Sequence, residues 1–150
     1  AAKNFTPGSC LCGAVKVTVT GEPDFQIVCH CTDCRGWFGS CNFGCVFPVS
    51  QVKVEGDLIS YNVTQHRGQE GGWFRKCCKK CGACITATHE GLGLDDVAAG
   101  IICGPGPSDR KFKPTCHTFY GERIFSVPDD LPKYTGYPKE MGGDGVTVVE

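Results

Sequence analysis

The residues with the clearest chemical potential are three cysteines within six positions, Cys29, Cys31 and Cys34. Their C-x-C-x-x-C spacing lets two thiolates from a tight turn and a third from the adjoining extended segment converge on one ion. Zinc prefers four tetrahedral ligands, and a catalytic zinc keeps one position open for water or substrate. Because no obvious fourth ligand stands nearby, the pattern favours an open zinc site. Two alternatives remain: a closed structural zinc with a distant fourth ligand, or a disulfide with a spare thiol.

A second zinc site is predicted from two further pairs of cysteines, each followed by a glycine that reaches positive φ at low cost. The pairs are Cys10 with Cys12, and Cys78 with Cys81. Together they supply the four thiolates of a structural site, which would join distant parts of the chain and contribute folding free energy directly. Cys77 and Cys84 offer competing registers. We prefer Cys78 and Cys81 because Cys84 opens a predicted strand, where its side chain should pack.

Composition limits the class of protein. The chain has 150 residues, 13 cysteines and a net charge of −1, without a long basic run, so nucleic-acid binding has no electrostatic support. No apolar stretch approaches the roughly 20 residues that a membrane span needs, and residues 1–8 lack the apolar centre of a signal peptide. An odd cysteine count in closely spaced pairs indicates metal binding in a reducing, cytoplasmic setting.

The elements that must position these cysteines are short strands between glycines and prolines. We expect strands at 14–20, 26–28, 42–49, 52–55, 58–63, 73–76, 84–88, 97–103, 117–120 and 123–127. Loops are expected at 65–72 and 104–107, and a loose tail from Pro128. Only residues 34–38 are expected to form a helical turn. The pattern predicts one all-β domain over residues 1–150, with coiled antiparallel strands.

Several stretches together closely resemble the glutathione-dependent formaldehyde-activating enzyme (GFA) family. The matching stretches are residues 8–15, 29–35, 39–40 and 78–82, with His117 and residues 128–132. The resemblance implies the family's Mss4-like β-tent fold, in a single GFA-type (CENP-V/GFA) domain. It also implies a structural zinc on Cys10, Cys12, Cys78 and Cys81, and a catalytic zinc on Cys29, Cys31 and Cys34. Near the catalytic zinc a thiol such as glutathione would bind, as in the family's carbon–sulfur lyases.

The chain departs from the family pattern near the expected pocket. Cys77 stands where a phenylalanine is usual, and Phe125 where a tryptophan is usual. Trp37 and Phe38 are bulkier than the residues expected after the catalytic loop. An aromatic-lined pocket suggests a carbon skeleton larger than formaldehyde.

Three thiolates donate much charge to zinc, which favours holding a soft sulfur ligand over activating water. Making or breaking a carbon–sulfur bond fits such a site, with a nearby acid or base moving the proton. His117 is the first catalytic candidate, because it begins a predicted strand and matches a family histidine; alternatively, a backbone carbonyl satisfies its ring. Asp33 and Arg35 flank Cys34 and are candidates for a direct role or for orienting the loop. His30, between two ligands, is expected to point away.

Two side chains are candidates for contact with the substrate or glutathione. Trp37 follows the open site directly, although it also suits the core. Arg75 lies in a basic cluster with Lys76, Lys79 and Lys80, which suits either a solvated surface or the binding of glutathione's carboxylates.

The sequence therefore favours a zinc-dependent lyase with two zinc ions per chain, acting on a small thiol or aldehyde adduct, with a homo-oligomer possible. One alternative is a zinc-stabilised binding or chaperone module in which the three cysteines close a second structural site. Another is an enzyme of the same fold that acts on a secondary metabolite.

Overall fold

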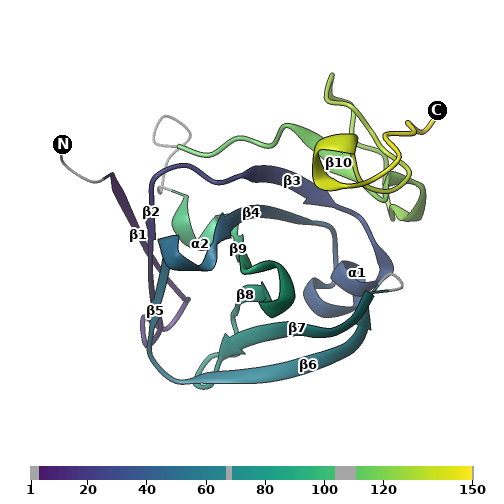
Figure 1. Ribbon diagram of the computed structural model, residues 1–150. Helices are drawn as coiled ribbons and strands as arrows, with labels where there is room; N and C mark the ends of the chain where they lie inside the picture. Colours follow the sequence, from purple (N-terminus) through teal and green to yellow (C-terminus); the bar gives the residue numbers. More distant parts are fainter. Residues whose placement is uncertain (1–3, 67–68, 104–110, 150) are drawn as a thin grey trace. The chain divides into compact units, whose positions relative to one another are not determined.

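The computed structural model describes residues 4–66, 69–103 and 111–149. Short strands dominate (Figure 1), so the all-β prediction is confirmed. The strands are β1 (Phe5–Ser9), β2 (Lys16–Thr20), β3 (Phe25–Cys29), β4 (Asn42–Pro48), β5 (Val52–Glu55), β6 (Leu58–His66), β7 (Gln69–Cys78), β8 (Cys84–His89), β9 (Leu94–Ala98) and β10 (Cys116–Thr118). Helical turns are α1 (Thr32–Phe38), η1 (Val49–Gln51), η2 (Glu90–Leu92), α2 (Ala99–Ile102), η4 (Tyr120–Glu122) and η5 (Lys139–Met141). Over these described ranges, no helix has the length and apolar character that crossing a membrane requires.

The chain divides into two compact units, each built from two separate segments. Unit 1 comprises Ala1–Phe25 and Cys45–Phe112, and unit 2 comprises Gln26–Gly44 and Lys113–Glu150. Strand β4 contributes residues to both units. The four-cysteine group falls within unit 1 and the three-cysteine group within unit 2. Each predicted metal site can therefore be described inside its own unit.

Unit 1 contains a three-stranded antiparallel sheet in the order β1-β2-β5. Strand β2 follows the period-2 rule of a half-buried strand, because Val17 and Val19 are fully buried while Lys16 is exposed. Strands β6 to β9 of the same unit form an antiparallel meander, visible side by side in Figure 1. The meander brings Cys78, the last residue of β7, opposite Leu58 at the start of β6.

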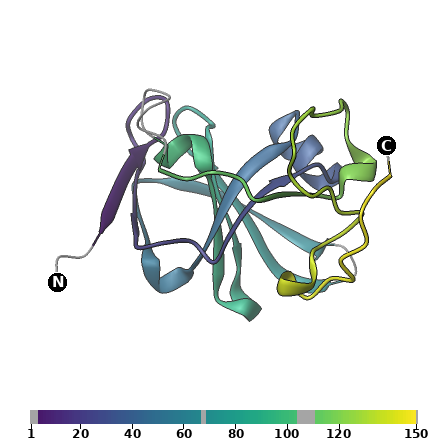
Figure 2. The ribbon, with the colours of Figure 1, turned by 90° about the horizontal axis from the view of Figure 1, so that it is seen from above.

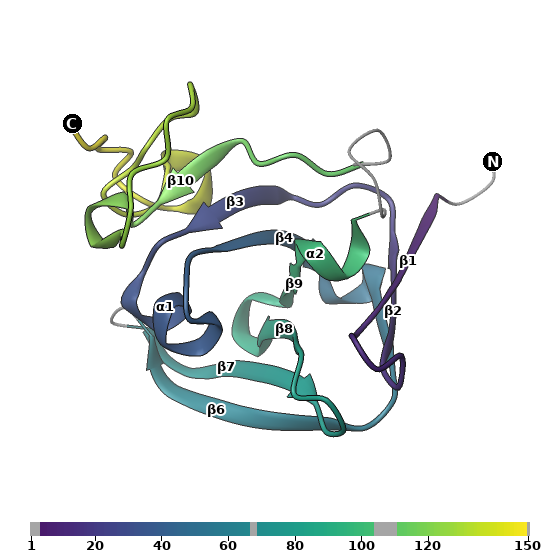
Figure 3. The same cartoon turned by 180° about the vertical axis from the view of Figure 1, so that it is seen from behind.

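Unit 2 is organised around the parallel pairing of β10 with β3, in which Thr118 lies opposite Cys29. Figure 3 shows α1 as the bend that directly follows β3. Beyond β10 the chain folds back in loops (Figure 2), tied by isolated bridges between His117 and Lys133 and between Tyr134 and Thr147. The tail expected to be loose is therefore hydrogen-bonded to the strand that carries His117.

Most of the expected strands are present, but three of the expected segments differ in the structure, and helical turns also form outside 34–38. The run at 97–103 is a strand only to Ala98 and then forms α2, since a short apolar run does not distinguish a strand from a buried helix. No strand forms at 123–127, where the Val127 N–H donates to the Tyr120 hydroxyl (2.8 Å) instead of to a neighbouring strand. The loop at 65–72 is mostly occupied by the ends of β6 and β7, which pair there.

Three further segments remain to be compared with the expected elements. Strand β1 was not expected, because its sequence contains Pro7 and Gly8. The loop expected at 104–107 lies outside the described residues. The helical turn expected at 34–38 is confirmed as the longer helix α1.

Gly56, in the turn between β5 and β6, supports the four-cysteine region. Its φ is 123°, and a Cβ there would lie 2.4 Å from the Ala14 carbonyl oxygen and 3.0 Å from the Val15 Cα. The next residue, Asp57, accepts the Lys79 N–H at its carbonyl oxygen (3.0 Å). This one turn therefore contacts the chain directly after the first cysteine pair and within the second.

We expect Gly56→Ala to lower the free energy of unfolding by about 2–4 kcal/mol, because it adds backbone strain and a steric clash. Urea denaturation of the metal-loaded protein measures this. Gly100→Ala is the matched control: a Cβ there meets nothing within 4 Å, so its unfolding free energy should stay the same or rise by up to about 1 kcal/mol. Equal losses in the two variants would contradict the assignment.

Candidate metal centres

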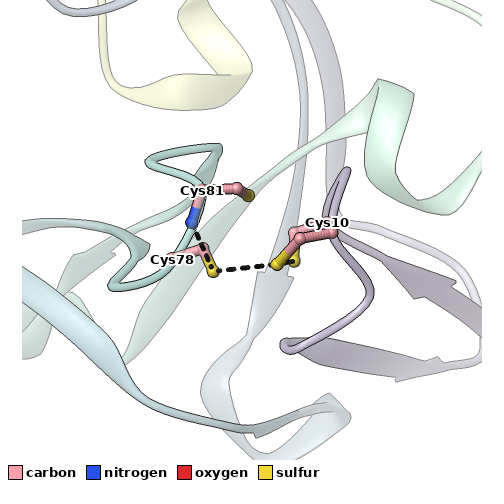
Figure 4. A group of neighbouring side chains, drawn as sticks. Cys10, Cys78 and Cys81 are labelled. Carbon is pink, nitrogen blue, oxygen red and sulfur yellow. Dashed lines mark hydrogen bonds between the residues drawn. The ribbon is translucent and has the colours of Figure 1, made fainter.

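Four cysteines of unit 1 converge from two turns. Cys10 and Cys12 lie between β1 and β2, whereas Cys78 ends β7 and Cys81 lies in the turn before β8. Their Sγ atoms all lie within 4.8 Å of one another. Figure 4 shows the side chains of Cys78 and Cys81 facing Cys10 from the opposite turn. The two pairs, 66 residues apart in sequence from Cys12 to Cys78, thus meet at one point.

The spacing of these sulfurs fits zinc. A tetrahedron with Zn–S bonds of about 2.3 Å has sulfur atoms about 3.8 Å apart. The Sγ of Cys12 lies 3.7 Å from that of Cys10 and 3.8 Å from that of Cys78. Cys77 and Cys84 are outside the group and lie opposite each other across β7 and β8. The geometry therefore favours the register with Cys78 over the competing ones.

Backbone amides stabilise these thiolates. The Val15 N–H donates to the Cys10 Sγ (3.3 Å) and lowers the pKa of that thiol to about 6. The Cys81 N–H donates a hydrogen bond to the Cys78 Sγ (3.4 Å). Gly13 and Gly82, which follow the two pairs, have φ of 79° and 77°, so the left-handed turns expected after each pair are present.

The second cluster lies at the turn between β3 and α1 in unit 2. Cys29 ends β3, Cys31 is the N-cap of α1, and Cys34 lies in its first turn. The Cys34 N–H donates to the Cys31 Sγ (3.3 Å), an N-cap bond that shapes the turn. All three residues are buried, and their Sγ atoms lie within 4.8 Å of one another. Among the residues that the structure describes, no fourth cysteine, histidine or acidic side chain joins this group.

The donor set of this cluster suits a cation. Close contact with Cys31 and Cys34, together with burial, raises the pKa of the Cys29 thiol well above its usual value. Three buried thiols at this distance resist simultaneous ionisation, because each thiolate repels the others. A bound divalent cation removes that cost and deprotonates its thiol ligands. The two cysteine clusters could therefore both bind zinc.

An apolar edge adjoins the three cysteines. Phe38 and Phe119, both only partly buried, pack against the cluster. Phe38 follows Cys34 by four residues on α1, so both side chains point from the same face of the helix.

Two buried histidines and an aspartate form a hydrogen-bonded chain that begins at His30, between Cys29 and Cys31. His30 Nε2 lies 2.8 Å from His117 Nδ1, and His117 Nε2 lies 2.8 Å from Asp129 Oδ2. Both histidines are only 1% exposed. Burial, followed by the neighbouring His117, lowers the pKa of His30 to about 4. Lys133 Nζ also donates to Asp129 Oδ1 (2.8 Å), so the chain ends in an ion pair at the surface.

The hydrogen bonds to Asp129 and His30 define which ring nitrogen of His117 carries the proton. Burial raises the pKa of the Asp129 carboxyl, but hydrogen bonds from Lys133 and then His117 outweigh it and lower the pKa to about 2. An ionised carboxylate only accepts, so His117 donates from Nε2; in its neutral form it then accepts at Nδ1 from His30. Both ring nitrogens of His117 are thus engaged inside the protein. The sequence analysis gave Asp129 no role. The signal that could have found it is that a buried histidine such as His117 needs a hydrogen-bond partner.

The other predicted residues are distributed more widely. Asp33, Arg35 and Trp37 all lie on α1, and Arg35 Nη1 donates to the Glu122 carbonyl oxygen (2.9 Å). Arg35 also lines a surface hollow whose lining does not include Cys34 or Phe38. The other lining residues are Thr32, Gly36, Gly39 and Ile124. Arg75 lies in β7 of unit 1 and is only 7% exposed.

The short antiparallel strands and the two cysteine groups, which could hold zinc, are consistent with the Mss4-like β-tent fold. Residues 5–122 match the family model described as glutathione-dependent formaldehyde-activating enzyme (GFA), and the chain belongs to this family. A crystal structure of a Rhodobacter sphaeroides protein is similar in fold, with a TM-score of 0.55 and 21% identity. The similarity covers 75% of this chain and 99% of that one. No curated protein matches the sequence.

If both clusters bind zinc, single ligand changes should separate their roles. We expect Cys10→Ser and Cys31→Ser each to reduce zinc from two ions per chain to one, measured by atomic emission. Cys10→Ser should also lower the melting temperature by more than about 10 °C, because a structural zinc contributes folding free energy. Cys31→Ser should stay folded by circular dichroism. Two ions retained in either variant would contradict the assigned ligand.

The low pKa of Asp129 predicts an acid-dependent contribution to stability. Its folded-state pKa of about 2 is below the ordinary 3.8, so the pairing stabilises above about pH 4 and is lost as the pH falls towards 2. Asp129→Asn should melt about 2–4 °C below the unmodified protein at pH 6, a modest effect because the side chain is 33% exposed. That difference should shrink as the pH falls from 4 to 2. Asp130→Asn, the control with the same charge change, should show no such dependence.

Proposed function

We propose that this protein is a zinc-dependent carbon–sulfur lyase of the GFA type. It would make or break the bond between the sulfur of a thiol, glutathione first, and the carbon of an aldehyde or another electrophile. The observation that supports this most is the buried group of Cys29, Cys31 and Cys34, which the described residues leave at three ligands. Family membership adds the link to glutathione and formaldehyde.

In this proposal Cys29, Cys31 and Cys34 hold the zinc. When bound, zinc would supply the affinity for the substrate sulfur and lower the pKa of its thiol. In the forward direction the S–H proton is lost, the sulfur attacks the carbonyl carbon, and the carbonyl oxygen gains a proton. The overall addition therefore needs no oxidant and no further reactant.

The surrounding residues would position these events. The Cys34 N–H fixes the Cys31 sulfur, while Phe38 and Phe119 keep water from one edge of the cluster. We propose that His117 acts through its bond to His30, because its two ring nitrogens face His30 and Asp129. Asp33 and Arg35, on either side of Cys34, are proposed to orient the helix turn, and for Arg35 the bond to the Glu122 carbonyl supports this.

Contacts with the substrate are also proposals. Trp37, partly buried on α1, is proposed to touch the carbon part of the substrate. Arg75, the contact with a glutathione carboxylate predicted from the sequence, lies in unit 1 and is buried, which leaves little guanidinium surface for a ligand; its role stays a prediction. The alternative of a non-catalytic zinc-stabilised module needs a fourth protein ligand at the three-cysteine cluster, which the described residues do not supply. An enzyme of this fold acting on a larger secondary metabolite is favoured by the aromatic edge of the cluster.

The test measures the rate at which glutathione and formaldehyde form their adduct. Exchange NMR follows this rate with the protein present, and the rate of the spontaneous reaction without protein is the reference. We expect the zinc-loaded protein to accelerate adduct formation, chelation to abolish the acceleration and added zinc to restore it. Cys31→Ser should lose about 100-fold or more in rate. Cys41→Ser, a change outside the cluster but in the same unit, should keep full activity. Acceleration that survives removal of the metal would reject the proposal.

A further inference from the structure

Phe119 has an unusual backbone conformation directly beside the three-cysteine cluster. Its φ and ψ are 50° and 40°, and it is the one non-glycine residue with positive φ in the described part of the chain. This left-handed region is costly for an aromatic residue, and such strain persists only where the surrounding structure enforces it. Here the Phe119 N–H donates to the Gly136 carbonyl (3.4 Å) and its own carbonyl accepts the Glu122 N–H (3.0 Å).

The strained residue follows the strand that supports a metal ligand. Thr118, the last residue of β10, lies opposite Cys29 in the parallel pairing, and Phe119 comes next. Its ring packs against the cysteine cluster, and Tyr137 contacts the ring edge-on, with centroids 4.9 Å apart and planes at 86°. The ring is thus held from the cluster side and from the C-terminal segment.

Exposure indicates which edge of the cluster the ring occupies. Cys29, Cys31 and Cys34 are at most 8% exposed, whereas Phe38 and Phe119 are only partly buried. Rings that contact a buried group and are themselves partly exposed extend from that group towards solvent. Glycine or asparagine would adopt the same backbone conformation at lower cost. The chain instead has a phenylalanine at this strained position, and its ring is what contacts the cluster.

We propose that Phe119 is a specificity-determining residue. With Phe38, its ring forms an apolar wall at the solvent-facing edge of the cluster. The site therefore takes ligands with an apolar group next to the reacting sulfur or carbonyl carbon. This inference rests on the proposed function, because it requires a metal on the three cysteines that accepts an outside thiol.

The experiment measures ligand binding and needs no turnover. The protein is loaded with Co²⁺ in place of Zn²⁺ and titrated with benzyl mercaptan and with 2-mercaptoethanol. Binding of each thiol is followed by the change in the sulfur-to-cobalt charge-transfer band. The unmodified protein should bind benzyl mercaptan more tightly. Phe119→Gly and Phe119→Asn, which both suit the left-handed backbone, should reduce that preference at least fivefold, and Phe119→Tyr should retain it.

Val146→Ala is the control, because Val146 lies in the same unit, is 52% exposed and is not among the apolar side chains packed on the cluster. Its preference should stay within twofold of the unmodified protein. An unchanged preference in Phe119→Gly and Phe119→Asn, with both thiols still bound, would overturn this inference alone. If neither thiol changes the spectrum of the unmodified cobalt protein, the proposed function fails and this inference fails with it.

Discussion

The mutual repulsion of closely packed thiolates is the constraint on which this structure depends. Seven cysteines lie in two groups whose sulfurs are within 4.8 Å of one another, and neither group can ionise fully without a cation between its members. In unit 1 the sulfurs already have the separations of a zinc tetrahedron. Amide donors from the adjoining turns support the charge. The fold therefore provides geometry, and the metal would provide the energy that makes this geometry favourable.

The two groups differ in what surrounds them. The four-cysteine group is completed by protein ligands and connects two turns far apart in sequence, which is the role of a structural zinc. The three-cysteine group has a hydrogen-bonded chain of histidines and an aspartate behind its turn, and aromatic rings against the sulfurs. Side chains alternate along an extended segment, so Cys29 and Cys31 face one way and His30 the other. One short stretch thus carries the sulfurs of the cluster on one side and the hydrogen-bonded chain of His30, His117 and Asp129 on the other.

The His30–His117–Asp129 chain also explains why the C-terminal segment is ordered beside β10. Asp129 binds His117 and Lys133, and Lys133 bridges back to the strand at His117. These bonds connect the turn that carries Cys29, the strand β10 and the segment after it within one unit. A segment rich in proline and glycine has little core of its own, and here polar contacts to buried histidines supply its attachment.

The sequence by itself determined the local features: the spacing of the clustered cysteines, the glycines after the paired cysteines, the alternating strand β2 and the helical turn at 34–38. Each depends on residues a few positions apart, where backbone geometry alone restricts what is possible. Tertiary structure brought the two predicted cysteine pairs together and left Cys77 and Cys84 outside the group. It also placed Asp129 on His117, and turned Phe119 onto the cluster. Cys12 and Cys78 are 66 residues apart, and His117 and Asp129 are 12 apart. For Asp129 and Phe119, the pattern along the chain carries no information about the contact. Packing and the satisfaction of buried polar groups select such contacts only once the strands have paired.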